Sequence, residues 1–198
     1  RDDWVFEVVT SLSSQEREKI CIKLVVSQPD KQVGRKKEFQ YTPVKGVGLN
    51  AGIEVLQPAN FKLSPNPSPR EGNIVDILKS LDLDFIIVVA YGKIIPQNIL
   101  DIPKYGWINL HGSILPQCRG ASPVQAAIKA WERETWLTTM YMSRGMDEGD
   151  ILEIAKIKVD NVDTSEDIFQ KFVDIGPELL LSTLQKVYAW KLTWLPQN

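Results

Sequence analysis

The residues best suited to chemistry lie near the middle of the chain, in Asn109-Leu110-His111-Gly112-Ser113. This segment ends an apolar run that predicts a β-strand, and His111 is the only histidine in the chain. Side chains alternate across a strand, so Asn109 and His111 should lie on the same side of the sheet, where an amide donor and an imidazole can converge on one carbonyl oxygen. Such a pair suits acyl chemistry.

A second polar segment, Gly145-Met146-Asp147-Glu148-Gly149-Asp150, lies between two further strand candidates. Taken alone, it is an ordinary turn, because glycine and acidic residues are usual there, and a lone histidine at a strand end is more often a simple hydrogen-bonded residue. The presence of both polar segments in one chain is less common. Functional sites in α/β sheets lie where polar groups follow the carboxyl ends of parallel strands. Together the two segments favour a functional site.

The elements that must position these residues are predicted from hydrophobic patterns. Strands are predicted at Ile22–Val26, Asp84–Ala90, Trp107–Leu110, Leu137–Met142 and Ile151–Val159. Helices are predicted at Gly72–Leu81, Ser122–Trp131 and Ser165–Trp190. The run Phe85–Ala90 is apolar at every position, as expected of a strand covered on both faces. The alternation of strands and helices predicts an α/β fold with a doubly wound, mostly parallel sheet.

Two signals concern the last helix. Thr164, followed three residues later by Asp167, resembles a capping box and predicts the helix start. Gly176-Pro177 lies inside the helical pattern, and we expect it to kink or split the helix. The proline-rich stretch 60–72 predicts an exposed connection.

Composition narrows the class of protein. The chain has 198 residues and 43% hydrophobic content, enough for the core of one domain, which we place at residues 1–198. The net charge of −2 means that any nucleic-acid binding must depend on a local basic patch. Cys21 and Cys118 form no CxxC motif, which favours a reducing compartment and hence the cytoplasm. No apolar run approaches the roughly 18 residues needed to cross a membrane, and a monomer is the default expectation.

The polar segments resemble the site pattern of the formyltransferases that use 10-formyltetrahydrofolate. That pattern is Asn-x-His, then Ser-Leu-Leu-Pro, then a Gly-x-Asp-x-Gly-Asp loop. The matching residues are Asn109-Leu110-His111, Ser113-Ile114-Leu115-Pro116 and Gly145-Met146-Asp147-Glu148-Gly149-Asp150. The resemblance implies a Rossmann-like formyltransferase fold and runs from about Leu24 to Leu184.

More narrowly, the chain resembles the formyltransferases that act on methionyl-tRNA. The segments that carry this similarity are Gln28-Pro29-Asp30, Gly34-Arg35-Lys36-Lys37, Ala90-Tyr91-Gly92 and Arg119-Gly120-Ala121. Cys118, Glu148 and Trp136 depart from the residues usual in the family, and none of the three departures removes a catalytic group. Family members also have a first strand before the position of Arg1 and a C-terminal β-barrel domain after Pro196, and we expect both to be absent from this chain.

The resemblance implies roles for the site residues. Asn109 would donate a hydrogen bond to the formyl oxygen, His111 would stabilise the developing charge, and Asp147 would orient His111 and help to move the amine proton. Ser113, Ile114, Leu115 and Pro116, with Tyr91 and Gly92, would hold the folate cosubstrate. No metal is expected, because one histidine and two distant cysteines make no convincing zinc shell with Asp147. No Gly-x-Ser-x-Gly frames Ser113, so a serine nucleophile is not favoured.

The segment Lys31–Lys45 carries five basic residues and a single acid, Glu38. Composition alone favours a solvated loop. The similarity of Gly34-Arg35-Lys36-Lys37 to the tRNA enzymes reverses that preference, so Arg35, Lys36 and Lys37 are the candidates for binding the phosphates of initiator methionyl-tRNA.

The expected reaction is therefore formyl transfer from 10-formyltetrahydrofolate to initiator methionyl-tRNA. One alternative is a formyltransferase for a small amine, such as glycinamide ribonucleotide or an amino sugar nucleotide, which would not need the basic loop. A second is a hydrolase that releases formate from the same cosubstrate. A third is a non-catalytic fragment that binds folate or RNA only.

Overall fold

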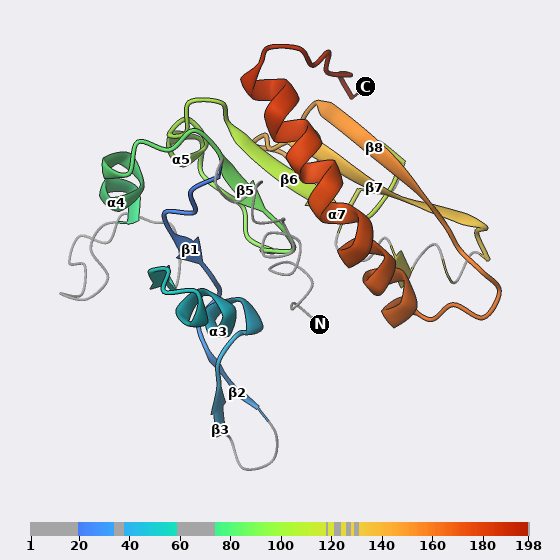
Figure 1. Cartoon of the computed structure of the whole chain (residues 1–198), viewed down its shortest axis with the longest axis horizontal. Coiled ribbons are helices and arrows are strands. Elements are labelled where there is room, and N and C mark those ends of the chain that lie inside the picture. The colour runs from blue at the N-terminus through green and yellow to red at the C-terminus, as the bar shows by residue number, and fades with distance from the viewer. Residues whose placement is uncertain are drawn as a thin grey trace.

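A computed structural model describes residues 20–33, 38–58, 74–117, 119–120, 124–125, 128 and 131–197. In chain order its elements are β1 (Val25–Val26), β2 (Lys31–Val33), β3 (Glu38–Gln40), α3 (Pro43–Asn50), β4 (Val55–Leu56), α4 (Ile74–Ser80), β5 (Ile86–Val88), α5 (Gln97–Leu100), β6 (Trp107–His111), β7 (Glu134–Tyr141), β8 (Ile151–Lys158) and α7 (Ser165–Tyr188). Strands and helices alternate through most of this order, as predicted for an α/β fold (Figure 1).

The strands of the described residues form three sheets. Strand β1 pairs in parallel with β4, and β2 with β3 makes an antiparallel hairpin that projects away from the larger sheet (Figure 1). The larger sheet has the order β5-β6-β7-β8. Its β5–β6 pair is parallel, whereas β6–β7 and β7–β8 are antiparallel. The α/β class is therefore confirmed, with its parallel pairs in the first half of the chain and an antiparallel edge in the second half.

Strand β6 separates the core into two layers. Ile108 and Leu110 lie in the apolar cluster that includes buried residues of α7, which lies across this face of the sheet (Figure 1). Trp107 lies in the cluster built with α4 and α5. Because side chains alternate along a strand, Asn109 and His111 share the face of Trp107, away from α7.

Helix α7 is held to the sheet by polar as well as apolar contacts. Thr183 is fully buried and its hydroxyl lies 2.8 Å from that of Thr139 on β7. It also donates to Glu153 on β8 at 2.8 Å. These buried groups have partners across three elements, which fixes where the helix lies on the sheet.

The ends and interior of α7 test two predictions. The capping box is confirmed, since the Thr164 hydroxyl accepts from the Asp167 amide while the Asp167 carboxylate accepts from the Thr164 amide. The Thr164 hydroxyl and the Thr164 amide both donate to the Asp167 carboxylate, and these two hydrogen bonds lower the pKa of Asp167. The predicted split at Gly176-Pro177 is wrong, because α7 runs unbroken through both residues. Gly176 has no Cβ to clash with the proline ring, and both residues are buried in the helix interface.

Several element boundaries also differ from the sequence patterns. Strands β1 and β5 are shorter than predicted, and β7 begins three residues earlier, at Glu134. Most of the predicted helix Ser122–Trp131 and all of the proline-rich stretch 60–72 lie outside the described residues. Among the helices of the described residues, none combines the length and apolar character needed to cross a membrane.

The turn after β6 packs directly against α7, and this contact generates a stability prediction. A Cβ on Gly112 would lie 2.6 Å from the ring of Phe172, which is fully buried and has no room to move. We expect Gly112→Ala to lower the free energy of unfolding by about 1–3 kcal/mol through overpacking. Gly46→Ala is the control: a Cβ there meets no atom within 4 Å, so replacing this helical glycine should raise stability by up to about 1 kcal/mol. Urea unfolding measures both changes, and equal effects of the two variants would contradict the prediction.

Candidate active site

The structure brings together the histidine and the carboxylate that the sequence analysis singled out. His111 ends β6, and Asp147 lies in the loop between β7 and β8. His111 Nε2 and Asp147 Oδ2 are 3.9 Å apart, and their side chains are only 11% and 16% exposed. This distance is longer than a hydrogen bond but short enough for strong attraction between a carboxylate and a protonated imidazole.

Asn109 lies two residues before His111 on the same face of β6. The register pairs Asn109 with Val88 on one side and with Met140 on the other, and it pairs His111 with Thr138. Asn109 is half-buried in the middle of the sheet, so the strands on both sides hold its backbone in place. The predicted placement of Asn109 and His111 on one face is therefore confirmed by the pairing.

The loop around Asp147 is held by its backbone. Asp147 has a φ of 53°, a left-handed conformation that most side chains disfavour. A Cβ on Gly149 would lie 1.9 Å from the Tyr141 carbonyl oxygen, so only glycine allows the loop to close against the end of β7. Gly120 donates its amide to Asp147 Oδ2 at 3.0 Å. Sequence reasoning assigned no role to Gly120, because a backbone donor leaves no signal in a side-chain pattern.

The turn Ser113–Pro116 lies just after β6, the strand that carries Asn109 and His111. Ser113 is 2% exposed, and its carbonyl accepts a 2.6 Å hydrogen bond from the buried Thr138 hydroxyl. Leu115 packs in a small cluster with Met140 and Ile151. The turn is thus fixed to β7 and β8 by one polar and one apolar contact, while Pro116 is exposed.

Tyr91 and Gly92 follow β5, at the same edge of the sheet as the end of its parallel neighbour β6. Gly92 has a φ of 67°, and the Tyr91 carbonyl accepts a hydrogen bond from the Gln28 side chain at 2.8 Å. Burial raises the pKa of Tyr91 to about 12, so its phenol stays protonated at neutral pH. Gln28 comes from the segment after β1, so this bond joins that segment to the segment after β5.

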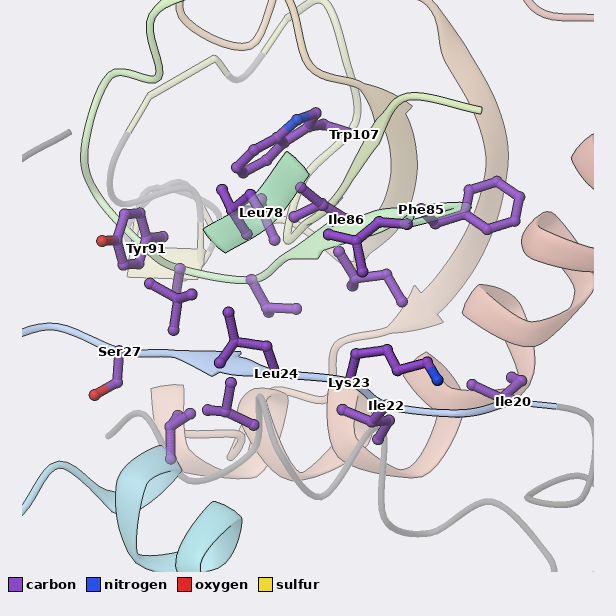
Figure 2. A pocket seen from close by; sticks show the side chains of 18 of the residues that line it. Ile20, Ile22, Lys23, Leu24, Ser27, Leu78, Phe85, Ile86, Tyr91 and Trp107 are labelled. Atoms are coloured by element: carbon purple, nitrogen blue, oxygen red, sulfur yellow. The ribbon is translucent and has the colours of Figure 1, made fainter. Parts of the chain in front are cut away.

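A cavity of about 1160 Å³ lies away from these catalytic candidates, between the segment that contains β1 and the segment that contains β5 (Figure 2). Neither Asn109, His111 nor Asp147 lines it, whereas Tyr91 does. The walls are mostly aliphatic. The polar side chains suited to acyl chemistry therefore lie outside the cavity.

The basic candidates Arg35, Lys36 and Lys37 fall between β2 and β3 and lie outside the described residues. The base of that hairpin is held by polar contacts of Asp30. Asp30 accepts from Lys45 at 2.5 Å and from Gln57 at 2.8 Å. Burial alone would raise the pKa of Asp30, but these hydrogen bonds hold it below its usual value.

The arrangement supplies an amide donor, an imidazole and a carboxylate within one part of the sheet. Together they can stabilise a developing oxyanion and accept a proton, which are the requirements of acyl transfer to an amine. Within the described ranges, no three histidine, cysteine or acidic side chains gather as a metal shell would require.

Comparison with known proteins identifies the family. The chain matches the formyl transferase family over residues 3–184. It is 42% identical over 166 residues to the methionyl-tRNA formyltransferase of Francisella tularensis subsp. tularensis, a match that covers 84% of this chain and 51% of that protein. The chain therefore spans about half the length of the curated relatives it matches.

Solved structures share the fold. The phosphoribosylglycinamide formyltransferase of Bacillus halodurans superposes with a TM-score of 0.73 at 22% identity, over 95% of this chain and 91% of that one. The formyltransferase PseJ of Anoxybacillus kamchatkensis, solved in complex with a nucleotide sugar and tetrahydrofolate, gives a TM-score of 0.56 at 22% identity, over 89% and 82% of the two chains. With a family match that covers most of its length, this chain belongs to the formyl transferase family.

Proposed function

We propose that the chain carries the catalytic centre of a methionyl-tRNA formyltransferase, which moves the formyl group of 10-formyltetrahydrofolate to the amino group of initiator methionyl-tRNA. The observation that carries this proposal is the juxtaposition of His111 and Asp147 beside Asn109, in a chain 42% identical to an enzyme of that name. We propose that the reaction takes place in the cytoplasm and that the protein acts as a monomer, without a metal.

The three polar side chains divide the work of the transfer. The acceptor nitrogen forms a bond to the formyl carbon, and the formyl oxygen becomes negative in the tetrahedral species. Asn109 donates to that oxygen, and His111, which lies 3.9 Å from Asp147, stabilises the developing charge. As the bond between the formyl carbon and N10 breaks, the carboxylate of Asp147 accepts the amine proton, which passes to N10 of the leaving folate.

The cosubstrate supplies an activated formyl group, and the turn after β6 is suited to hold it. Ser113, Ile114, Leu115 and Pro116 follow His111 immediately, and Tyr91 and Gly92 lie at the same sheet edge. The turn is fixed by contacts within the protein, so it needs no ordering when ligand binds. The related PseJ was solved with tetrahydrofolate bound, which supports a folate cosubstrate for this chain.

The β2–β3 hairpin is the proposed contact for the tRNA. Arg35, Lys36 and Lys37 connect its strands, and Phe39 and Tyr41 beside them are 71% and 60% exposed. Basic side chains bind phosphates, and exposed aromatic rings can stack on bases. A small-amine formyltransferase remains the second candidate, because phosphoribosylglycinamide formyltransferases share the fold.

The transfer itself is tested with Asp147→Asn. The amide keeps an oxygen to accept from Gly120 but cannot accept the amine proton, so formyl transfer should fall by roughly 10²- to 10³-fold. Asp174→Asn, on the exposed surface of α7, is the matched control and should retain full activity. Product is measured with methionyl-tRNA, with glycinamide ribonucleotide and with no acceptor. Transfer to the small amine alone, or release of formate without an acceptor, would overturn the tRNA assignment.

The acceptor assignment is tested by replacing Arg35, Lys36 and Lys37 together with alanine. Loss of phosphate contacts should raise the KM for methionyl-tRNA and weaken its dependence on salt, while the KM for the folate stays unchanged. Alanine at the exposed Lys156, Lys158 and Lys191 makes the same change of charge elsewhere and should have no such effect. An unchanged KM for the tRNA in the first variant would favour a small-amine acceptor.

We also propose that the β1–β4 pair and the four-stranded sheet are joined in the whole protein by one further strand, seated in the cavity between β1 and β5. Within the described part of the chain, β1 pairs only with β4 and β5 only with β6. Ile20 to Ser27 and Phe85 to Tyr91 run in the same direction along opposite walls (Figure 2). A parallel strand needs hydrogen-bonding partners on both sides and apolar cover, and these walls offer both. The C-terminal β-barrel domain of the family is likewise proposed to follow in the whole protein.

Thiol labelling tests the further strand. After Cys21 and Cys118 are changed to serine, Leu24→Cys places one thiol on the cavity wall and Ile108→Cys places one in the core. Residues 1–198 alone should react quickly at position 24 and slowly at position 108. A chain extended at its N-terminus by the proposed strand should protect both. Equal labelling of position 24 in the two chains would contradict the proposal.

A further inference from the structure

The segment that follows α7 returns to the catalytic loop. The backbones of Leu195 and Ile151 exchange two hydrogen bonds of 2.9 Å, which anchors this segment at the start of β8. Two residues later, Gln197 donates from Nε2 to the carbonyl of Gly149 at 2.6 Å. Gly149 lies two residues after Asp147 in the same loop, so the segment contacts the loop that holds the carboxylate.

The other end of the Gln197 amide contacts a second segment of the site. Its Oε1 accepts from Arg119 Nε at 3.1 Å and from Arg119 Nη2 at 2.9 Å. Arg119 directly precedes Gly120, whose amide donates to Asp147 at 3.0 Å. One amide side chain therefore bridges the two segments that meet at the Asp147 carboxylate.

These contacts close a ring that runs from Asp147 through Gly120, Arg119, Gln197 and Gly149 back to Asp147. A ring of this kind limits how far the loop can move relative to the segment Arg119–Gly120, because separating the two segments breaks hydrogen bonds of the ring. The position of Asp147 matters here, because its carboxylate lies 3.9 Å from His111 and a small displacement changes that contact.

We propose that Gln197 is a positioning residue, which sets the place of Asp147 relative to His111 by tying the loop after β7 to the segment Arg119–Gly120. Gln197 acts through the backbone of Gly149 and through Arg119, and it does not touch the reacting atoms. The inference rests on the proposed formyl transfer for its kinetic consequence, but the ring itself can be tested without activity.

Gln197→Met tests the role, because it keeps the length of the side chain and removes all three of its hydrogen bonds. We expect kcat to fall roughly tenfold to a hundredfold, the cost typical of a small misplacement of a catalytic group, with little change in the KM for either substrate. Gln170→Met is the matched control, since among the described residues the exposed Gln170 side chain bonds to Asp174 on its own helix and to no residue of the site. It should leave kcat unchanged, and both variants should unfold at nearly the same urea concentration.

Two readouts separate positioning from a general structural role. Arg119→Ala combined with Gln197→Met should lower kcat no further than Gln197→Met alone, because both changes open the same ring. Hydrogen exchange at the Gly120 amide should become faster in Gln197→Met and stay unchanged in Gln170→Met.

The outcomes also separate this inference from the proposed function. If the unaltered chain forms no formylated product, the proposed function fails, and faster exchange at Gly120 still supports the ring. If the unaltered chain is active but Gln197→Met changes neither kcat nor exchange at Gly120, the inference is overturned. A fall in kcat with unchanged exchange at Gly120, or strictly additive losses in the double variant, would also overturn it.

Discussion

The structure depends on one constraint, that strand β6 packs against α7 with one face and presents the polar side chains of Asn109 and His111 on the other. Ile108 and Leu110 pack toward α7, and this apolar contact fixes the strand in the sheet. Asn109 and His111 then have to point to the opposite face. A shift of one residue in the register would exchange these sets, burying the polar pair under α7 at a large desolvation cost. The same packing that stabilises the fold therefore orients the two polar side chains of the candidate site.

The carboxylate is positioned in a different way, by backbone contacts and not by side-chain packing. Asp147 itself has a left-handed backbone, and the close approach of the loop to the Tyr141 carbonyl needs glycine at position 149. Its carboxylate is held by the amide of Gly120, from a segment 27 residues earlier in the chain. A loop held by its backbone and by hydrogen bonds from other segments can bring a charged group close to a strand end without burying that charge completely.

The contrast between the catalytic groups and the large cavity follows from the sheet topology. The candidate catalytic residues gather where β6 ends and the β7–β8 loop returns, whereas the cavity lies between the segments that contain β1 and β5. An apolar cavity shows where the fold lacks covering side chains. Polar side chains that lie close together show where chemistry can occur. In this chain the two properties fall in different places, so the size of a cavity is a poor guide to the site.

The sequence by itself determined the α/β class, the positions of the central strands and the residue types of the site. Hydrophobic period and turn residues are local properties, and the spacing Asn109–His111 and the glycines around Asp147 are visible in a linear pattern. Only the tertiary structure decided that His111 and Asp147 meet, that α7 continues through Pro177, and that β6 pairs in antiparallel fashion with β7. It also decided the contacts of Gly120 and Gln197 with the Asp147 loop. These features depend on contacts between residues far apart in the chain, whose free energies no local pattern records.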